Sequence, residues 1–378
     1  MKVLILSCDT GEGHNSAAYA IYDYLKTVNV ECEVVDALSL KSRQASKMAA
    51  VTYLRVIKIP FLFRIIYNAG RLLSNTKIKS PVYYMNKCYK DQLHNYINKY
   101  GFDTIMTTHL FPAEALTALK REKRLNVPTI AVNTDYTCIP FWEETELDYY
   151  IIPHKDLIDE FYRRGIPKEK LLPFGIPIKP EFYEKIPKDE ARKKFCELYN
   201  ISFDVSKPWY MIMSGSMGYG KVHQLVNAII KLQKTDTNII VICGINNKLK
   251  YKLDNEYKKF TNVAILGFCK DIPLIMDACD VLFTKPGGLS STEAAVKNIP
   301  IIHTAPIPGC ETRNAQFFRK RSMSYSSKSI RKQLKTAIRI CNDDGYRNHI
   351  LQSQAENISR NTCSNIYKLL TELKERKE

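Results

Sequence analysis

The sequence lacks the cysteine patterns of a zinc site or a disulfide framework. Its 11 cysteines are scattered along 378 residues, with no CxxC pair and no metal-ligand spacing to a histidine. Several of them lie within apolar runs, as free thiols do in a reducing compartment. We therefore expect no structural zinc ion and no disulfide framework, and a chain that works in the cytoplasm.

Long apolar runs are also missing. The stretch "MKVLILSCDTGEGH" has an apolar core, Val3 to Leu6, that is too short for a signal peptide, and Asp9 and Glu12 follow at once. No segment approaches the ~20 uncharged apolar residues that a membrane-spanning helix needs. The opening stretch is better interpreted as a first strand that runs into a loop, and we expect no helix that crosses a bilayer.

Acidic residues are scarce in one window of a chain whose net charge is +17. Residues 41–100 contain 12 Lys and Arg but a single acid, Asp91. Within this window, residues 48–73 interleave aromatic and aliphatic residues with single cations, and Pro60 interrupts the pattern. Two basic amphipathic helices lying on an anionic membrane would give this pattern, and so would a core helix pair with solvated cations. The membrane interpretation places five residues at the headgroups: Arg55, Lys58, Phe61, Phe63 and Arg64.

What the sequence does contain is an alternation of strand-like and helix-like segments, which predicts an α/β protein with parallel sheets. A first series of strands is expected at Lys2–Ser7, Glu33–Val35, Thr104–Thr108, Thr129–Asn133 and Tyr149–Ile152. A second series is expected at Trp209–Met213, Ile239–Cys243, Val263–Leu266, Val281–Thr284 and Ile299–His303. The Pro-rich, charged segment 171–190 separates the two series. We therefore predict Rossmann-like domains at 1–175 and 176–360, followed by a C-terminal helix at 361–378.

Three glycine-rich loops follow strands of these two series. They are "CDTGEGHNSAA" (8–18), "MSGSMGYGKV" (213–222) and "KPGGLSSTEAA" (285–295). In the last loop, Gly287 and Gly288 precede hydroxyl residues at a helix start, an arrangement that suits a diphosphate. The alternative is that Ser290 and Glu293 form a capping box, in which they only close the helix end.

These motifs and their order resemble a known glycosyltransferase family. It contains the monogalactosyldiacylglycerol synthases and the processive diacylglycerol glucosyltransferases, and more distantly the N-acetylglucosaminyltransferase that completes lipid II. The resemblance covers nearly the whole chain. It rests on "SCDTGEGHNSAA" (7–18), "NTDYTCIPFW" (133–142), "GIPIKPEF" (175–182), "GSMGYGKV" (215–222), "GFCKDIPLIMDACDVLFTKPGGLSSTEAA" (267–295) and "PIPGCETRNAQFF" (306–318).

The resemblance implies a GT-B fold, in which two facing Rossmann-like domains with parallel sheets enclose an interdomain cleft. It also implies a UDP-sugar donor held by the C-terminal domain without a metal ion or other cofactor. The backbone around Phe268 would meet uracil, Glu293 would bind the ribose hydroxyls, and Glu311 and Asn314 would lie near the donor sugar. The diphosphate would lie against Gly215, Ser216, Met217, Gly218, Gly287, Gly288, Ser290, Ser291 and Thr292.

On the acceptor side, the resemblance places the loop with Gly11, Gly13 and His14 near the anomeric carbon. Either Asp9 or His14 would take the proton of the attacking hydroxyl, and the sequence does not choose between them. His14 could instead be an ordinary residue at a helix start. His109 is a weaker candidate in the same region, and His303 is as readily a strand-end residue as a donor contact.

The implied activity is an inverting transfer of a hexose, glucose first and galactose second, to diacylglycerol at the inner face of the cell membrane. A polyprenyl-linked or soluble acceptor remains an alternative, and a nucleic-acid-binding protein is disfavoured because no such module is recognised. The chain departs from the family at Cys310 (often Gln), at Cys138-Ile139-Pro140 (where His is common) and at "RKRSMSYSSKS" (319–329). The oligomeric state is left open.

Overall fold

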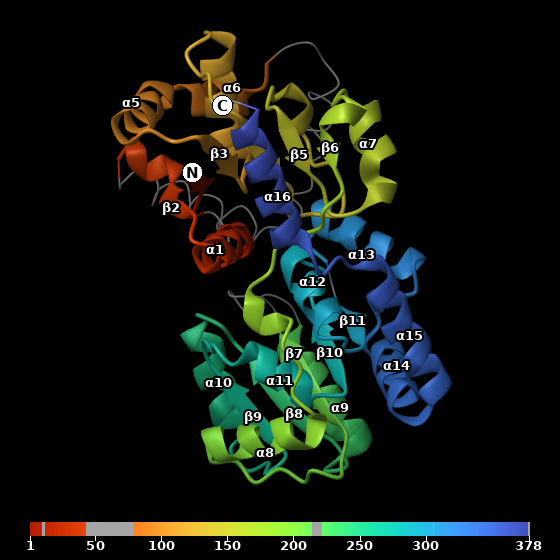
Figure 1. Cartoon of the computed structure of the whole chain (residues 1–378). Coiled ribbons are helices and arrows are strands. Elements are labelled where there is room, and N and C mark those ends of the chain that lie inside the picture. Colours follow the sequence, from red (N-terminus) through yellow and green to blue (C-terminus); the bar gives the residue numbers. More distant parts are fainter. Residues whose placement is uncertain (10–11, 43–78, 214–220, 305, 377–378) are drawn as a thin grey trace. The chain divides into compact units, whose positions relative to one another are not determined.

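The computed structural model of the chain describes residues 1–9, 12–42, 79–213, 221–304 and 306–376. They form two compact units (Figure 1). Unit 1 comprises Met1–Pro180, Pro308–Arg313 and Ser359–Glu378, and unit 2 comprises Glu181–Ile307 and Asn314–Ile358. The five residues predicted to meet the membrane (Arg55, Lys58, Phe61, Phe63 and Arg64) lie outside the described residues.

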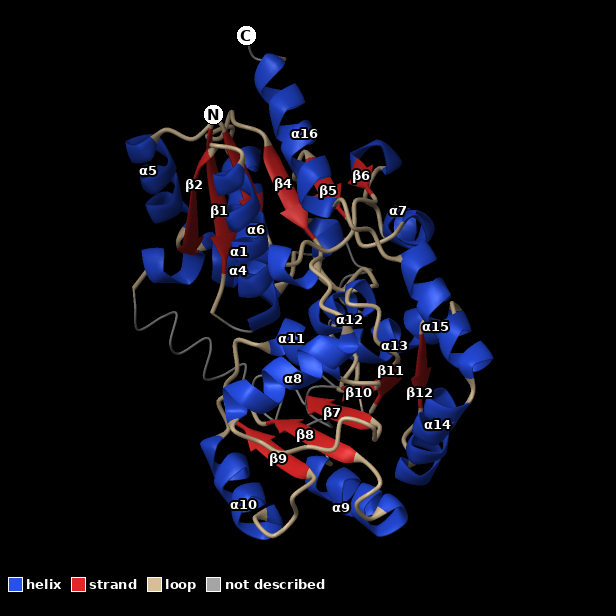
Figure 2. Ribbon diagram, turned by 60° about the horizontal axis from the view of Figure 1, so that its bottom comes forward, coloured by secondary structure: helices blue, strands red, loops and turns tan. Residues whose placement is uncertain are grey.

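Unit 1 is built on a six-stranded parallel sheet with the order β2-β1-β3-β4-β5-β6 (Figure 2). Its strands are β1 (Lys2–Ser7), β2 (Glu31–Asp36), β3 (Thr104–Thr107), β4 (Thr129–Val132), β5 (Tyr149–Ile151) and β6 (Leu171–Leu172). Its helices are α1 (Glu12–Thr27), α4 (Pro81–Lys87), α5 (Lys90–Tyr100), α6 (Leu110–Arg121), α7 (Ile158–Arg163) and α16 (Thr362–Glu375), with 3₁₀ turns at Ala37–Leu40, Trp142–Glu144, Lys155–Leu157 and Lys168–Lys170.

The C-terminal helix α16 belongs to the core of unit 1. Its buried face, which includes Ile366 and Leu370, packs with Ile21 and Leu25 of α1 against the strands. Thr362 at its start donates a hydrogen bond to the carbonyl oxygen of Phe174 (2.8 Å). The chain therefore returns to its first unit after completing the second.

Unit 2 has a second six-stranded parallel sheet with the order β12-β11-β10-β7-β8-β9. Its strands are β7 (Trp209–Met213), β8 (Asn238–Ile242), β9 (Val263–Leu266), β10 (Val281–Thr284), β11 (Ile301–His303) and β12 (Ser324–Ser326). Its helices are α8 (Lys188–Tyr199), α9 (Val222–Gln233), α10 (Asn247–Tyr257), α11 (Ile272–Ala278), α12 (Gly288–Val296), α13 (Cys310–Lys320), whose first residues fall in unit 1, α14 (Ile330–Asn342) and α15 (Asp344–Asn357), with a 3₁₀ turn at Pro180–Phe182.

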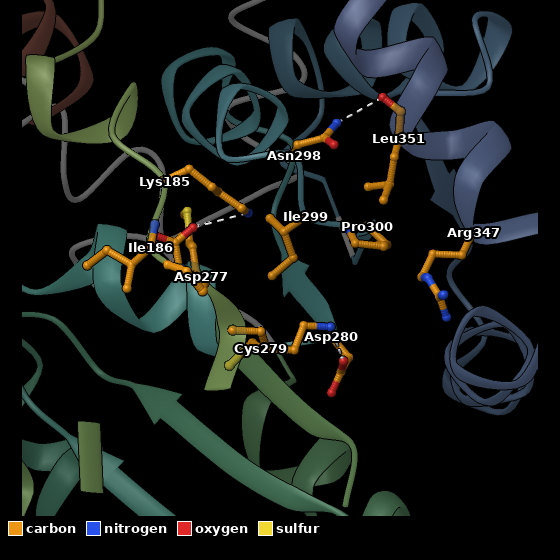
Figure 3. A pocket seen from close by; sticks show the side chains of 13 residues that line it. Lys185, Ile186, Asp277, Cys279, Asp280, Asn298, Ile299, Pro300, Arg347 and Leu351 are labelled. Carbon is orange, nitrogen blue, oxygen red and sulfur yellow. Dashed lines mark hydrogen bonds and ion pairs between the residues drawn. The ribbon is translucent and has the colours of Figure 1, made fainter. Parts of the chain in front are cut away.

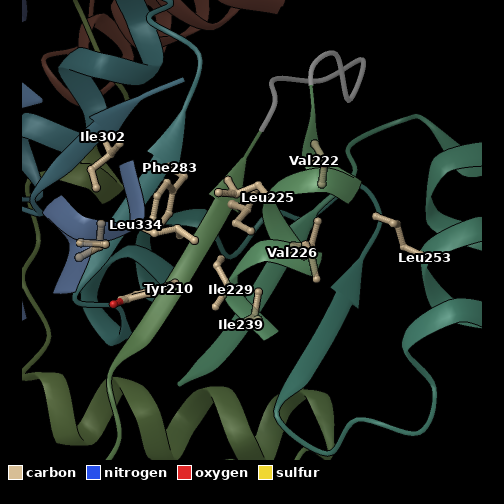
Figure 4. Packing of buried hydrophobic residues seen from close by; sticks show 14 of the residues in the cluster. Tyr210, Val222, Leu225, Val226, Ile229, Ile239, Leu253, Phe283, Ile302 and Leu334 are labelled. Atoms are coloured by element: carbon tan, nitrogen blue, oxygen red, sulfur yellow. The ribbon is translucent and has the colours of Figure 1, made fainter. Parts of the chain in front are cut away.

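The core of unit 2 is formed in part by alternate residues of its strands, which point to the same face of the sheet. Tyr210 and Phe283 point to one face of the sheet, where they meet Val226 of α9 and Leu334 of α14 (Figure 4). Trp209 is also fully buried, and its ring meets Phe195 of α8 edge-to-face. Both faces of these strands are thus apolar, as parallel sheets covered by helices require.

All ten predicted strands are present, with small shifts at their ends. β11 begins at Ile301 and not at Ile299, because Pro300 has no N–H to donate to a ladder. The sequence analysis missed β6 and β12, which have two and three residues. The prediction of an α/β protein with two parallel sheets is confirmed.

Candidate active site

His14 lies in the first turn of α1, directly after the loop that follows β1. Its Nδ1 atom lies 2.7 Å from the carbonyl oxygen of Thr108, at the end of β3, and 3.1 Å from Oγ1 of Thr134, after β4. A carbonyl oxygen can only accept, so Nδ1 must carry the hydrogen. Both hydrogen-bond contacts of the ring among the described residues involve Nδ1. Nε2 is then the nitrogen with the lone pair, as a general base needs.

The surroundings of His14 keep its ring neutral at neutral pH. Burial lowers the pKa of His14, while the carboxylate of Asp135 and the contact with Thr108 partly oppose that effect. A neutral imidazole is the form that accepts a proton. Asp135 and Thr134 were not singled out in the sequence, although both lie in the quoted segment 133–142.

Asp9, the other candidate base, is linked to His14 by a chain of hydrogen bonds. Asn15 Nδ2 donates to Asp9 Oδ1 (2.7 Å), and Asn15 Oδ1 accepts from Ser7 Oγ (2.5 Å). Thr108 Oγ1 donates to the backbone oxygen of His14 (3.0 Å) and lies 3.3 Å from Ser7 Oγ. Asp9 is exposed, whereas the His14 ring is held among strand ends.

His109 lies beside His14, with ring centroids 4.5 Å apart and the rings edge to face. Its Nδ1 accepts the N–H of Phe111 (3.1 Å) and so caps the start of α6. Burial and then the neighbouring His14 hold the pKa of His109 well below its usual value. The structure thus places His109 beside His14, the candidate base, and the side chain of His109 caps helix α6. Gly13 lies in α1, and Gly11 is outside the described residues.

In unit 2, the helix start at α12 differs from the capping-box alternative. The N-cap is Gly287, with no side-chain cap from any described residue, and Ser290 lies inside the first turn. The capping-box interpretation is therefore wrong, because a capping box needs the hydroxyl at the N-cap itself. A helix start of this kind leaves backbone N–H groups pointing at an anion site.

Two of the three hydroxyl residues in α12 turn away from that site. Ser291 is fully buried with its Oγ 3.0 Å from Nε2 of His303, and Thr292 Oγ1 donates to the Gly288 carbonyl (2.8 Å). Buried hydrogen bonds within unit 2 already use these two hydroxyls, which favours a structural role for them over the predicted contact with the diphosphate. Ser290 is only half-buried and keeps the predicted role.

His303 is a structural residue. Its ring is fully buried, and its Nδ1 lies 3.0 Å from Oγ of Ser324 in β12. Burial lowers its pKa to about 3, so the ring is neutral and bridges two serine hydroxyls. The sequence left open whether it contacts the donor, and these two contacts decide in favour of the strand-end role.

The other predicted donor residues fall into four groups. Asn314 is buried and its amide donates to the carbonyl of Pro286 (3.1 Å), so it holds the loop that precedes α12. Glu293 and Glu311 lie in α12 and in the first turn of α13, and both are largely buried. Phe268, after β9, is 66 % exposed. Gly215, Ser216, Met217 and Gly218 are outside the described residues.

Unit 2 also holds a cavity of about 240 Å³ at the opposite edge of its sheet (Figure 3). It is lined by Asp280 and Pro300, which precede β10 and β11, and by Lys185 and Arg347. Lys185 Nζ pairs with Asp277 Oδ1 (3.1 Å), and Asp277 also pairs with buried Lys297. Ligands of parallel α/β sheets bind at the carboxyl ends of strands. We therefore assign the cavity to the packing of the 184–188 segment and not to the active site.

Within the ranges that the structure describes, no helix is long and apolar enough to span a membrane. Among the same residues, no cluster of three or more His, Cys, Asp or Glu side chains has the geometry of a metal site.

Comparison with protein families identifies both halves of the chain. Residues 14–178 match the monogalactosyldiacylglycerol synthase model, and residues 210–368 match the glycosyltransferase family 28 C-terminal domain. The chain is 30 % identical over 320 residues to a processive diacylglycerol beta-glucosyltransferase of Bacillus pumilus, a match that covers 84 % of this chain and 80 % of that protein. A Staphylococcus saprophyticus relative of the same name is 29 % identical and covers 85 % of this chain and 79 % of its own length.

The chain belongs to this glycosyltransferase family. Its fold is that of the GT-B neighbours: Acinetobacter baumannii MurG superposes with a TM-score of 0.63 at 12 % identity, covering 98 % of this chain and 99 % of that one. A Neisseria meningitidis UDP-GlcNAc 2-epimerase gives 0.64 at 12 % identity, with 98 % and 100 % covered. The predicted family and fold are confirmed, and the chain is a glycosyltransferase.

Proposed function

We propose that this glycosyltransferase moves a glucosyl group from UDP-glucose to diacylglycerol, with inversion, at the inner face of the cell membrane. The family and the names of its relatives support this choice of donor sugar and acceptor. The observation that carries the chemistry is the ring of His14, whose Nδ1–H is held by the Thr108 carbonyl. An acceptor hydroxyl at Nε2 would lose its proton to a neutral imidazole.

In this proposal, the bond changes are those of a single displacement. The acceptor oxygen forms a bond to the anomeric carbon as the bond to the diphosphate oxygen breaks, and the hydroxyl proton passes to His14 Nε2. Attack opposite the leaving group turns an α-linked donor into a β-glucoside. The imidazolium that results lies near the Asp135 carboxylate, which favours its charge.

The departing UDP gains negative charge, which the start of α12 can stabilise. Its backbone N–H groups and the positive end of the helix dipole point toward an anion there, with Ser290 as an added donor. We propose that this arrangement makes an added metal ion or other cofactor unnecessary. Glu293 would accept the ribose hydroxyls, and Phe268 would lie against uracil.

Mass spectrometry of lipids tests the proposal. Purified protein is incubated with diacylglycerol in anionic vesicles and with UDP-glucose, UDP-galactose or UDP-N-acetylglucosamine, in the presence and absence of EDTA. We expect one hexose per diacylglycerol with UDP-glucose, insensitive to EDTA, and further hexoses if transfer repeats on the product. UDP binding without any lipid product would refute the lipid acceptor and leave the polyprenyl-linked or soluble acceptor.

A further inference from the structure

One segment of unit 2 carries positive charge that the active site does not use. Residues 314–342 contain eight Lys and Arg and no Asp or Glu. The segment includes "RKRSMSYSSKS" (319–329), one of the places where the chain departs from its family. Such a long run of positive charge without acids indicates either an anionic partner or a solvated surface. The positions of these side chains in the structure distinguish the two.

The structure gathers most of these cations on the outer side of one edge of unit 2. The segment covers most of α13, the edge strand β12 and α14, which lie along that edge (Figure 2). Seven Lys and Arg side chains of the segment within unit 2 are exposed, and one of them, Arg339, pairs with Asp343. The other six are Arg319, Lys320, Lys328, Arg331, Lys332 and Lys335. We call these six residues the α14 cationic face.

Helix α14 shows why the charges all point outward. Its buried side, Leu334, Ala337 and Ile340, packs into the core of unit 2. At 3.6 residues per turn, Arg331, Lys332 and Lys335 fall within an arc of about 100° on the other side. The apolar side of α14 is therefore buried within unit 2, and the opposite side of the helix exposes mainly cations.

Among the residues that the structure describes, the ion pairs recorded beside this face lie at its far end. Arg339, in the last turn of α14, pairs with Asp343 (3.1 Å), and Arg347 of α15 pairs with Asp344 (2.8 Å). Helix α10 differs in this respect, because its three lysines are followed by Asp254 and Glu256, and Lys250 pairs with Asp254 (2.5 Å). The α14 face is thus a concentrated positive surface, whereas α10 is a mixed one.

We propose that the α14 cationic face binds the anionic headgroups of a phospholipid bilayer, giving unit 2 its own contact with the membrane. The contact is electrostatic and does not insert, since the apolar side of α14 is buried in unit 2. Each Lys or Arg near an anionic surface contributes to binding and loses that contribution as salt screens it. The face would keep unit 2 near the surface that supplies the acceptor.

The choice of a bilayer over a nucleic acid rests on the proposed function and on one structural observation. Within the described chain, none of the exposed large apolar side chains lies between residues 312 and 342. Single-stranded nucleic acids are bound through such rings, on which bases stack. A bilayer surface needs only the charge.

The test compares two neutralised variants of the full chain that lose the same charge. The first, Arg331→Gln/Lys332→Gln/Lys335→Gln, alters the α14 face. The second, Lys248→Gln/Lys252→Gln/Lys259→Gln, alters three exposed lysines on or just after α10 in the same unit. Sedimentation with vesicles of phosphatidylglycerol and phosphatidylcholine gives the partition coefficient at low and high salt. UDP binding and thermal unfolding check that both variants fold.

We expect the α14 variant to lose on the order of a hundredfold in partition at low salt, from three cations near the surface. The α10 variant should lose much less, and high salt should remove the difference between them. Equal losses in both variants would mean that only net charge matters and would overturn the proposal. An α14 variant that sediments like the unaltered chain would also overturn it.

Two added measurements separate the remaining outcomes. If the α14 variant loses affinity for random oligonucleotides and not for vesicles, the bilayer is the wrong partner. Glycosyl transfer to detergent-dispersed diacylglycerol needs no bilayer, so both variants should retain it. Loss of that activity in the unaltered chain would refute the proposed function while leaving the vesicle result standing.

Discussion

At the scale of single residues, the hydrogen on Nδ1 of His14 determines which ring nitrogen can accept a proton. The Thr108 carbonyl holds that hydrogen across 94 positions of sequence. Sequence could name His14 and Asp9 as candidate bases but could not rank them, because the ranking depends on a contact with another strand end. The described contacts favour His14, whose lone pair on Nε2 is in the required state.

We predict that His14→Ala slows turnover by about 10²-fold or more, the usual contribution of a general base, with UDP affinity unchanged. Asp9→Asn should slow it far less, since the described contact of the Asp9 side chain is a hydrogen bond accepted from Asn15. Steady-state kinetics and UDP titration measure both effects. A full rate in His14→Ala, with a large loss in Asp9→Asn, would make Asp9 the base.

The effect of the Asp135 carboxylate on the pKa of His14 should be measurable in the pH dependence of kcat/KM. It raises the pKa of His14, against the larger lowering caused by burial. Because the neutral ring is the base, activity falls as pH falls through this pKa. Asp135→Asn should therefore move the acidic limb of kcat/KM to lower pH and lower the plateau about tenfold, through lost stabilisation of the imidazolium. An acidic limb that stays in place would mean that Asp135 acts only on structure, and Asp9→Asn serves as the control.

Glu114 in α6 should make unit 1 less stable as pH rises. Burial, and then the neighbouring Glu144, raise the pKa of Glu114 to about 10, so the folded state keeps a proton that the unfolded state releases above its ordinary pKa. Stability should fall between these two pKa values, by at most about 1.4 kcal/mol per pH unit. Glu114→Gln should remove this slope and stabilise unit 1 at pH 9.

The two tryptophans allow this measurement in one unit at a time. Trp142 is buried in unit 1 and Trp209 in unit 2. Urea unfolding of a Trp209→Phe background, followed by Trp142 fluorescence, reports unit 1 alone. An unaltered chain with equal unit 1 stability at pH 6 and pH 9 would contradict the assignment of a buried proton to Glu114.

At the scale of elements, the residues at the start of α12 divide into those that could bind a ligand and those with a structural role. Gly287 has ordinary dihedral angles (φ −69°, ψ 140°), and a Cβ added there meets no atom within 4 Å. Space left open at a helix start is where an anion would approach. Sequence predicted the loop and the helix but left a capping box at Ser290 and Glu293 open as the alternative, because the Ser-x-x-Glu pattern is local and the true helix start depends on how β10 ends.

We predict that Gly287→Ala weakens UDP binding at least tenfold while changing stability by less than about 1 kcal/mol, the range of N-cap substitutions. Ser291→Ala should do the opposite: it removes a buried partner of His303 and should cost about 1–3 kcal/mol in stability, with little effect on UDP affinity. Calorimetric UDP titration and thermal unfolding measure the pair. Equal UDP affinity in Gly287→Ala and the unaltered chain would argue against a diphosphate at α12.

At the scale of the whole molecule, the C-terminus completes the first unit. Four buried or nearly buried apolar residues of α16 belong to the core that includes α1: Ile366, Leu369, Leu370 and Leu373. Each such side chain contributes about 1.5–3 kcal/mol on burial. The sequence analysis predicted this helix at 361–378 as a separate segment, and only the folded chain assigns it to a core.

Deleting residues 361–378 should therefore destabilise unit 1 and spare unit 2. Hydrogen exchange followed by mass spectrometry should show lost protection in α1 and β1, with protection in β7 and β8 unchanged. A charge-only change on the exposed side, such as Lys368→Gln, provides a control that should leave both units protected. Uniform protection after the deletion would mean that α16 does not support the core of unit 1.

The sequence by itself determined the features that repeat locally. Apolar runs predicted ten strands and the α/β class, because each strand is a run of consecutive residues, whereas the order of the strands in each sheet came from the structure. The motifs specified the family. Tertiary structure alone decided what depends on distant partners: β6 and β12, which are too short to show a pattern and exist through pairing with β5 and β11; the bridge from Ser291 through His303 to Ser324; and the tautomer of His14. It also decided that α14 buries its apolar side and leaves its cations outward. Periodicity is read along one segment, whereas a hydrogen-bond partner is fixed only when segments far apart in the chain meet.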